Sequence, residues 1–357
     1  MTWDVAICGG GPAGLAAAIH AARKGFSAVV LERSAPPPDK ACGEGLMPRS
    51  LAALERLGAL QHVAADQQAP FRGIRYVHAG GAIEARFSGG NGLGLRRTAL
   101  SRALERRARD VGAEIRTASV RAVRPGAVET DQGTVETRLV VGADGLNSAV
   151  RRAAGLERPL RGRRRYGVRR HVQMSPWSDL VEVYWSDRAE AYVTPVGRRS
   201  VNVAFLWHEH ALPEKVSFEA LLEAFPELRE RIGDAPVESE ARGAGPLARA
   251  VKARTAPGIA LVGDAAGYVD AITGQGLGFA FASAELLVRA LPRDLAADGL
   301  SRALRRYDAS LRAEWMRYAV PARALVALAS RPALRRSALD LVQRHPSWFR
   351  LLLRAVA

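Results

Sequence analysis

The sequence predicts an α/β protein in which one parallel sheet carries an inserted antiparallel sheet and a C-terminal helical segment. Three observations predict this fold. The first 35 residues read as strand, glycine turn, helix and strand. Two later apolar strands, near residues 140 and 260, each end in a turn of Gly and Asp and lead into a helix. Between them, residues 156–250 alternate polar and apolar residues in the manner of antiparallel strands.

The first unit has the order of a Rossmann-like dinucleotide-binding motif. "WDVAIC" at 3–8 is an apolar strand, "GGGPAG" follows at 9–14, "LAAAIHAARKGF" has helical propensity, and "SAVVLERS" is a second strand ending in Glu32. Gly9 allows the tight turn, Gly11 lets the backbone approach a pyrophosphate, and Gly14 permits close packing of helix on strand. The helix start stabilises the phosphate charge, and Glu32 accepts hydrogen bonds from ribose hydroxyls. The unit predicts a bound adenine dinucleotide, and NAD and FAD both fit it.

The two later turns favour a flavin. "LVVGADGLNSAVRRAAGL" at 139–156 places Asp144 and Gly145 where an apolar strand ends. "GIALVGDAAGYVDAITGQGLGF" at 258–279 places Asp264 at the end of another strand, where its carboxylate can bind a ribityl hydroxyl. The glycines before the next helix let the helix start approach a ring and stabilise a reduced flavin through its dipole. The residues predicted at that helix start are Gly274, Gly276 and Leu277.

These three motifs, in this order, resemble those of the FAD-dependent oxidoreductases built like the aromatic hydroxylases, the geranylgeranyl reductases and the flavin-dependent halogenases. The resemblance implies FAD, with Asp144 and Gly145 in a turn over the flavin and Arg151 anchoring its helix or a phosphate. It also implies an arginine ahead of the helix in "LGLRRTALSRALERRA", which points to Arg97, with Arg96 as the alternative. "GAGPLA" at 243–248 lacks a following crossover helix, so we expect one dinucleotide domain and NAD(P)H as a transient reductant.

The predicted FAD-binding domain comprises residues 1–70, 89–155 and 251–300, the substrate domain residues 71–88 and 156–250, and a helical region residues 301–357. "DLVEVYWS", "EAYVTPVG" and "RSVNVAFLWH" are the strands expected in the substrate domain. Four aromatic residues on them are candidates to line a substrate pocket and are equally compatible with ordinary core. They are Tyr184, Tyr192, Phe205 and Trp207.

The amino-acid composition limits the cellular setting that we expect for the protein. Of 357 residues, only two are cysteines, which argues against a disulfide framework or a metal site and for a reducing, cytoplasmic setting. We expect no signal peptide and no membrane-spanning helix. The net charge of +16 is interpreted mainly as solvated surface, and no nucleic-acid module accompanies it.

The C-terminal segment "HPSWFRLLLRAVA" combines Trp348, Phe349, Leu352 and Val356 with Arg350 and Arg354. This combination is compatible with peripheral contact with an anionic membrane, with a cap over the substrate channel, or with packing against the protein.

The reaction is predicted from smaller features. The chain lacks the Trp-x-Trp-x-Ile-Pro signature of the halogenases, and Gly267 stands where aromatic hydroxylases usually have His. The run from Cys42 to Pro48 resembles the Cys-Gly loop of the geranylgeranyl reductases, which places Cys42 near the flavin or the substrate, or makes it a packing residue. No general base is identified among histidines such as His171, His208 and His210.

The extended segment "DKACGEGLMPRSLAALERLG" and the C-terminal region resemble bacterial flavoprotein oxygenases of polyketide and phenolic-lipid pathways. We therefore predict an FAD-dependent monooxygenase that uses NAD(P)H and O2 to hydroxylate a lipophilic aromatic or polyketide-derived substrate. The alternative is a flavoprotein that saturates isoprenoid double bonds, and a third reading is a flavin-binding protein without turnover.

Overall fold

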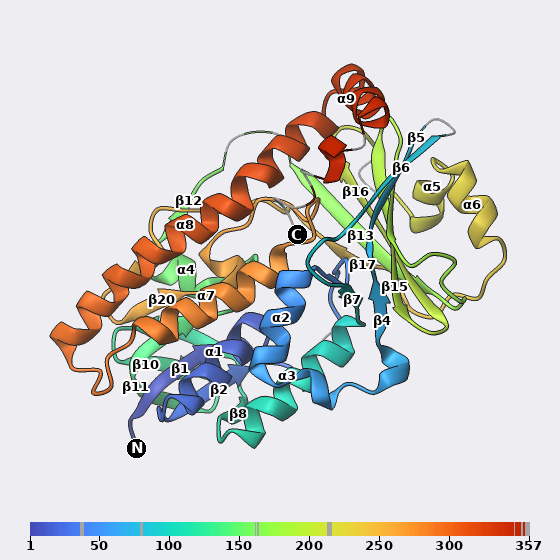
Figure 1. The fold of residues 1–357 in the computed structure, drawn as a ribbon. Coiled ribbons are helices and arrows are strands. Elements are labelled where there is room, and N and C mark those ends of the chain that lie inside the picture. The colour runs from blue at the N-terminus through green and yellow to red at the C-terminus, as the bar shows by residue number, and fades with distance from the viewer. Residues whose placement is uncertain are drawn as a thin grey trace.

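The computed structural model describes residues 1–35, 39–78, 81–160, 162, 164–212, 216–345, 347–350 and 353. Two large sheets dominate it (Figure 1). The α/β part contains the N-terminus, the antiparallel sheet lies beside it, and the long helix α8 runs along the first part toward the second. This is the predicted fold class.

The larger sheet has the order β19-β20-β11-β1-β2-β8, and all of these pairings are parallel except that of β19 with β20. A hairpin of β9 and β10 continues from β11. The strands are β1 (Trp3–Cys8), β2 (Ala28–Glu32), β8 (Glu114–Thr117), β9 (Val120–Arg124), β10 (Ala127–Thr130), β11 (Gly133–Gly142), β19 (Thr255–Ala256) and β20 (Ile259–Leu261). The central strands are apolar because helices and neighbouring strands cover both faces.

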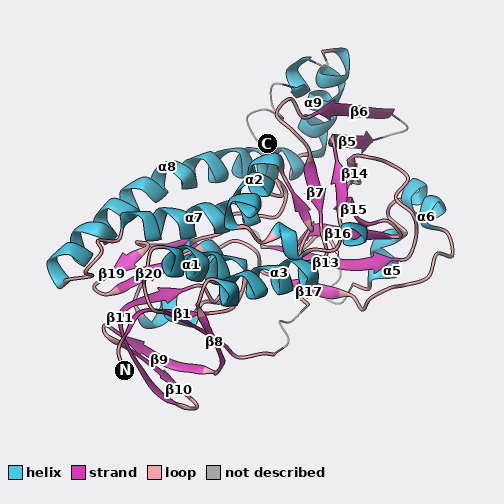
Figure 2. Ribbon diagram, turned by 60° about the horizontal axis from the view of Figure 1, so that its bottom comes forward, coloured by secondary structure: helices cyan, strands magenta, loops and turns pink. Residues whose placement is uncertain are grey.

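Helices α1, α3 and α7 form a layer against this sheet, and α8 packs on α7 (Figure 2). Alanines line the buried side of α1, so the helix approaches β1 and α7 closely. The helices of this part are α1 (Pro12–Arg23), α2 (Pro48–Leu57), α3 (Arg97–Asp110), α4 (Ala149–Ala153), α7 (Gly276–Ala290) and α8 (Ala297–Ala329). Short 3₁₀ turns cover Leu60–His62, Ala65–Gln67 and Gly263–Ala266.

The second sheet has the order β17-β13-β16-β15-β14-β5-β6, and only the β14–β5 pair is parallel. Helices α5 (Phe218–Leu222) and α6 (Pro226–Ile232) cover one face. The strands are β5 (Gly73–His78), β6 (Gly81–Arg86), β13 (Arg165–Val172), β14 (Val181–Trp185), β15 (Ala189–Gly197), β16 (Ser200–His208) and β17 (Arg242–Ala244). The three strands predicted from period-two alternation thus form β14, β15 and β16.

Smaller elements join the two parts. Strands β3 (Gly45–Leu46), β7 (Gly92–Gly94) and β4 (Ala69–Phe71) form a three-stranded sheet, and β12 (Glu157–Arg158) pairs with β18 (Ala250–Val251). Helix α9 (Pro332–Arg344) follows α8 and lies against β6. The "GAGPLA" segment enters β17, and no helix separates it from β20, as predicted.

Candidate functional site

The first glycine turn has the close contacts that its spacing predicts. A Cβ on Gly14 would lie 1.9 Å from the carbonyl oxygen of Gly9, so only glycine allows this approach of α1 to β1. The side of Gly11 is open by contrast, since a Cβ there would meet only the Nη2 atom of Arg97 at 3.8 Å. Glu32 closes the turn, because its Oε2 accepts a 2.7 Å hydrogen bond from the backbone N–H of Gly10.

Arg97, and not Arg96, is the arginine turned into the protein. Arg97 is buried, its side chain donates to Ser101, and no described carboxylate forms an ion pair with it. Burial lowers the pKa of its guanidinium. Arg96 instead forms an ion pair with Glu238 at 2.5 Å. A buried cation beside the open side of Gly11 and the start of α1 suits a phosphate group.

The Asp144 turn is mainly a structural cap. The Oδ2 atom of Asp144 accepts hydrogen bonds from the backbone N–H groups of Ala149 (2.7 Å) and Val150 (3.1 Å) at the start of α4. Gly145 has a φ of 78° and open space beside it, as a glycine in a turn over a ligand requires. The Oδ1 atom of Asp144 is buried and accepts no hydrogen bond from the described residues.

Arg151 ties the second and third motifs together. Its fully buried guanidinium donates to the carbonyl oxygens of Ala265 (3.2 Å) and Leu146 (2.7 Å). The resemblance implied that Arg151 anchors either its helix or a phosphate, and these contacts are those of a helix anchor.

The third motif presents a carboxylate and an open helix start. Asp264 begins the turn after β20, and no described residue donates a hydrogen bond to its carboxylate. Burial raises its pKa to about 6, against the lowering effect of Arg97, Lys40 and Arg151. Helix α7 begins at Gly276 and includes Leu277, and Gly274 before it has a φ of 64° with open space beside it.

These features fit FAD. Among the described residues, the Arg97 guanidinium has no carboxylate partner and the Asp264 carboxylate has no hydrogen-bond donor, and burying such groups without a ligand has a cost. Both lie near the open side of Gly11. Lys40 lies within electrostatic reach of Glu32, Arg97 and Asp264, so the parts of this cradle converge.

The Cys42 loop is held between the two sheets by residues that sequence reasoning missed. The Cys42 carbonyl accepts a 2.9 Å hydrogen bond from Asn202 on β16, and the Cys42 sulfur accepts one from the backbone N–H of Glu44 at 3.3 Å. Burial is the main cause that raises the pKa of the Cys42 thiol to about 11, so the thiol is protonated at neutral pH.

Glu44 links three elements. Its Oε1 accepts a 2.7 Å hydrogen bond from the backbone N–H of Arg97 at the start of α3, and its Oε2 lies 2.5 Å from Nε2 of His171 on β13. Ser239 lies 2.8 Å from the other ring nitrogen of His171. Glu44 also has a φ of 59°, unusual for a residue with a side chain.

The alternation of residues in the basic run at 161–171 is the sequence feature that could have indicated the buried contact of His171 with Glu44. Its alternation places Arg165, Arg169 and His171 on one face of β13, and all three are buried. The interpretation of the positive charge as solvated surface is therefore wrong for these residues. Arg169 forms an ion pair with Asp39, in the same loop as Cys42.

The four candidate pocket residues do not share one face. Tyr184 and Phe205 lie in the cluster that packs under α5 and α6, where Phe205 and Phe218 have ring centres 4.9 Å apart. Trp207 packs partly against the same cluster. Tyr192 faces the third motif and packs near Ile272. Alternation identifies residues on a common face of a strand, but not which face meets the other domain.

A buried cluster of charged residues joins the face of the antiparallel sheet that carries Tyr192 to the third motif. The guanidinium of Arg165 lies 2.9 Å from Glu190 and 3.3 Å from Asp270, and Tyr192 donates to Glu190 at 2.9 Å. Burial raises the pKa of Asp270 to about 6 although Arg165 lowers it. The antiparallel sheet thus presents polar groups to the predicted flavin loop.

Gly267 has a steric explanation. Its φ is 127°, and a Cβ there would lie 3.0 Å from the ring of Trp315 on α8. A His at this position, as aromatic hydroxylases usually carry, would therefore have a strained φ and would need the Trp315 side chain to shift by a few tenths of an ångström.

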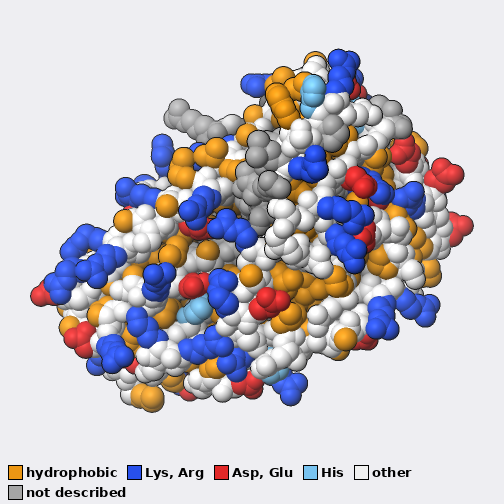
Figure 3. Space-filling model, in the orientation of Figure 1, with side chains coloured by type: hydrophobic (Ala, Val, Ile, Leu, Met, Phe, Trp, Pro, Cys, Tyr) orange, Lys and Arg blue, Asp and Glu red, His pale blue; other side chains and the backbone are white. Residues whose placement is uncertain are grey.

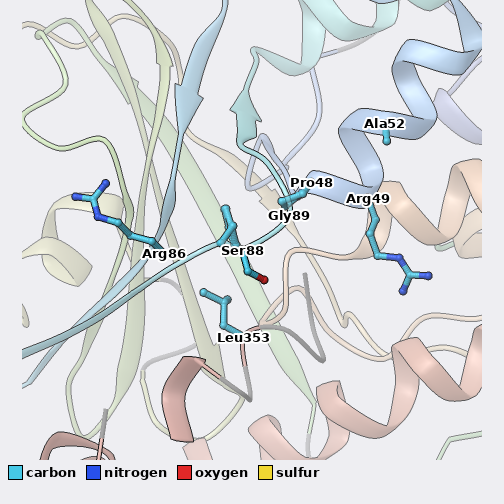
Figure 4. Close-up of a pocket in the computed structure, with 8 residues that line it drawn as sticks. Pro48, Arg49, Ala52, Arg86, Ser88, Gly89 and Leu353 are labelled. Carbon is cyan, nitrogen blue, oxygen red and sulfur yellow. The ribbon is translucent and has the colours of Figure 1, made fainter. Parts of the chain in front are cut away.

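A pocket of about 310 Å³ opens beside the start of α2 (Figure 4). Arg49 and Arg86 lie at opposite sides of it, with Ser88 and Leu353 between them. The full lining is Pro48, Arg49, Ala52, Arg86, Phe87, Ser88, Gly89 and Leu353. The pocket therefore adjoins the segment that follows the Cys42 loop.

Two further observations concern the described residues alone. They contain no group of three or more His, Cys, Asp or Glu side chains placed to hold a metal ion. None of their helices is both long enough and apolar enough to cross a bilayer.

Comparison with known proteins identifies a matching family and several similar proteins. Residues 2–319 match the family described as FAD binding domain. Menaquinone reductase of Mycobacterium tuberculosis is 29% identical over 321 residues, covering 82% of this chain and 78% of that protein. Digeranylgeranylglycerophospholipid reductase 1 of Methanopyrus kandleri is 30% identical over 340 residues, covering 86% and 85%. A solved structure of a probable FAD-dependent monooxygenase from Pseudomonas aeruginosa superposes with a TM-score of 0.80 at 22% identity, covering 95% and 100%.

Proposed function

Because the chain belongs to the FAD binding domain family, we propose that this FAD-dependent oxidoreductase saturates carbon–carbon double bonds of an isoprenoid chain. Relatives of similar length support the substrate class, since they are named as reductases of menaquinone and of a digeranylgeranyl lipid. The observation that carries the proposal is the protonated Cys42 thiol, held where the loop meets both sheets.

The residues of the cradle have separate tasks in this proposal. Gly11, Arg97 and the start of α1 hold the diphosphate, Glu32 binds a ribose, and Asp264 binds the ribityl chain. The start of α7 at Gly274–Leu277 stabilises negative charge on the ring. Reduced FAD supplies a hydride, and NAD(P)H is the reductant we expect for it.

Saturation of a double bond takes up one hydride and one proton. The Cys42 thiol donates the proton to the carbon that does not receive the hydride. The backbone N–H of Glu44, 3.3 Å from the sulfur, then stabilises the thiolate until it takes a proton from solvent. Asn202 holds the carbonyl of the same residue, so the thiol keeps its direction.

The monooxygenase expected from the sequence has weaker support. The likeness to a probable FAD-dependent monooxygenase is at 22% identity and concerns the fold alone. Gly267, with a φ of 127° and the Trp315 ring beside it, also stands where the aromatic hydroxylases usually carry His. The reductase, named above as the alternative, is therefore our first proposal.

The test incubates dithionite-reduced, FAD-loaded protein with detergent-solubilised menaquinone under argon in D2O. We expect products that carry two deuterium atoms at each saturated bond, seen by mass spectrometry, because the transferable hydrogen of dithionite-reduced FAD and the thiol proton both come from solvent. Cys42→Ala should lower this rate at least about tenfold while FAD stays bound. Cys8→Ala, which changes the other thiol, buried in β1, should react like the parent chain. Product that forms only with O2 and gains one oxygen atom would reject the reductase in favour of the monooxygenase.

A further inference from the structure

Exposed apolar side chains collect on the C-terminal helices. Leu334 and Leu341 on α9 are 50% and 43% exposed, and Trp348 just beyond α9 is 55% exposed. Leu334 and Leu341 are two helical turns apart and therefore share one face. In the C-terminal half of α8, Met316 and Val320 are exposed to a similar degree and lie four residues apart.

Arginines surround these apolar residues. Arg331 lies three residues before Leu334, and Arg344 lies three residues after Leu341, so both flank the apolar face. Arg350 follows Trp348. From Leu334 to Arg350, Asp340 is the only acidic residue of the sequence. We call Leu334, Leu341 and Trp348 with Arg331, Arg344 and Arg350 the α9 surface; Figure 3 shows orange apolar and blue basic atoms together at the end of the molecule that α9 forms.

The opposite face of this segment is firmly anchored. Arg335 is buried, its guanidinium lies 3.0 Å from Asp187, and it covers the ring of Trp185 at 5.4 Å. Phe349 is buried and its ring centre lies 5.4 Å from that of Tyr76. Of the tail residues named from the sequence, Leu352, Arg354 and Val356 lie outside the described residues. Leu334, Leu341 and Trp348 belong to none of the apolar clusters that the described residues form, and about half of each side chain is exposed.

We propose that the α9 surface docks on an anionic lipid bilayer. Apolar side chains ringed by arginines, with an exposed Trp, match the boundary between headgroups and acyl chains. The alternative occupant, a second copy of the chain, is disfavoured because a two-fold contact would bring the same three arginines of each copy together. An anionic bilayer neutralises these charges instead.

Docking places the bilayer next to the pocket at the start of α2. Leu353 lines that pocket, and with Phe349 it forms the inward side of the segment whose outward side carries Trp348. A chain leaving the bilayer would meet Phe87 and Pro48 there. This step rests on the proposed function, whereas docking itself does not.

The experiment is flotation of the FAD-loaded full chain with phosphatidylcholine vesicles, with and without phosphatidylglycerol. We expect flotation with the anionic vesicles and release by salt. Leu334→Ser/Leu341→Ser/Trp348→Ser should weaken binding at least about tenfold. Leu160→Ser/Val237→Ser removes apolar side chains that are 54% and 61% exposed elsewhere, and should bind like the parent chain.

Arg331→Gln/Arg344→Gln/Arg350→Gln should remove the preference for anionic vesicles. Flavin absorbance and melting temperature, unchanged in all variants, show that each chain is folded. Equal flotation of the triple Ser variant and its control would overturn the proposal, as would no flotation of the parent chain. Sedimentation equilibrium that shows a dimer dissociated by the triple Ser variant would assign the surface to a second copy. Because flotation needs no turnover, failure of the proposed reaction leaves this result unaffected.

Discussion

Glu44 and His171 form a fully buried contact, 2.5 Å between Oε2 and Nε2, that joins the Cys42 loop to the antiparallel sheet. The two residues lie 127 positions apart in the chain. Since Glu44 also accepts from the backbone of Arg97, one side chain connects the loop, the start of α3 and β13.

Removing the charge of Glu44 should destabilise the fold. Glu44→Gln turns one acceptor oxygen into an N–H donor and so disturbs the contacts with the backbone N–H of Arg97 and with His171, and a buried polar group left without its partner typically costs about 1–3 kcal/mol. Urea unfolding of the FAD-free chain measures the change. The control is Glu219→Gln, which removes the exposed ion pair between Glu219 and Arg170 and should cost less than about 1 kcal/mol. Equal effects of the two variants would mean that burial gives the Glu44 contact no special weight.

Arg97 and Arg96 should differ in FAD binding. Arg97→Ala removes the buried cation beside Gly11, and we expect FAD affinity about ten- to a hundredfold weaker, since a charge-assisted hydrogen bond contributes about 1.5–3 kcal/mol. Arg96→Ala breaks only the contact with Glu238 and should bind FAD within about twofold of the parent chain. Titration of the flavin-free protein by fluorescence quenching measures both. A larger loss in the Arg96 variant would assign the phosphate to the other arginine.

Gly11 and Gly14 should separate binding from folding. Gly14→Ala sets a Cβ 1.9 Å from the backbone oxygen of Gly9 and should cost about 3 kcal/mol or more, or prevent folding. Gly11→Ala meets no clash within the protein and should change the stability of the flavin-free chain by about 1 kcal/mol or less. It should still lose FAD, because the Cβ enters the space of the diphosphate. Tight FAD binding by the Gly11 variant would place the diphosphate elsewhere.

Asp264→Asn should stabilise the flavin-free chain while it weakens FAD binding. The carboxyl has a pKa raised to about 6. Because the folded state holds this proton more tightly than the unfolded chain, stability falls as the pH rises from about 4 to about 6. The variant removes this loss, so at pH 8 it should be more stable than the parent chain by up to about 3 kcal/mol and melt at a higher temperature, whereas at pH 4 the two should melt alike.

The control for Asp264 is the exposed Asp234, whose change to Asn should leave both stability and flavin binding unaltered. Retention of tightly bound flavin by Asp264→Asn would show that the ribityl chain does not use this carboxylate.

Much of the fold follows from local patterns. The spacing of Gly9, Gly11, Gly14 and Glu32 specifies a turn between a buried strand and a helix, and the tightest contact of this turn, between Gly14 and the carbonyl oxygen of Gly9, spans only five residues. Period-two alternation located β14, β15 and β16 for the same reason. The family relation, the FAD-binding fold and the antiparallel sheet could therefore be predicted, whereas the residue roles at the site stay predictions.

The remaining features depend on contacts between distant segments. The sequence left Arg96 and Arg97 as alternatives, because neighbouring residues differ only in which side of α3 they face. The sequence also suggested Tyr192 and Phe205 as residues of one pocket, but in the structure they lie on opposite faces of the sheet.

The sequence by itself therefore determined the Rossmann-like unit, the family and the positions of β14, β15 and β16, since hydrogen bonds and sterics act there over short spans of chain. Only the tertiary structure decided that Glu44 meets His171 and that Trp315 fills the space beside Gly267. Burial and partner identity at such positions depend on how whole elements pack, and that packing brings together residues with no fixed spacing in the chain.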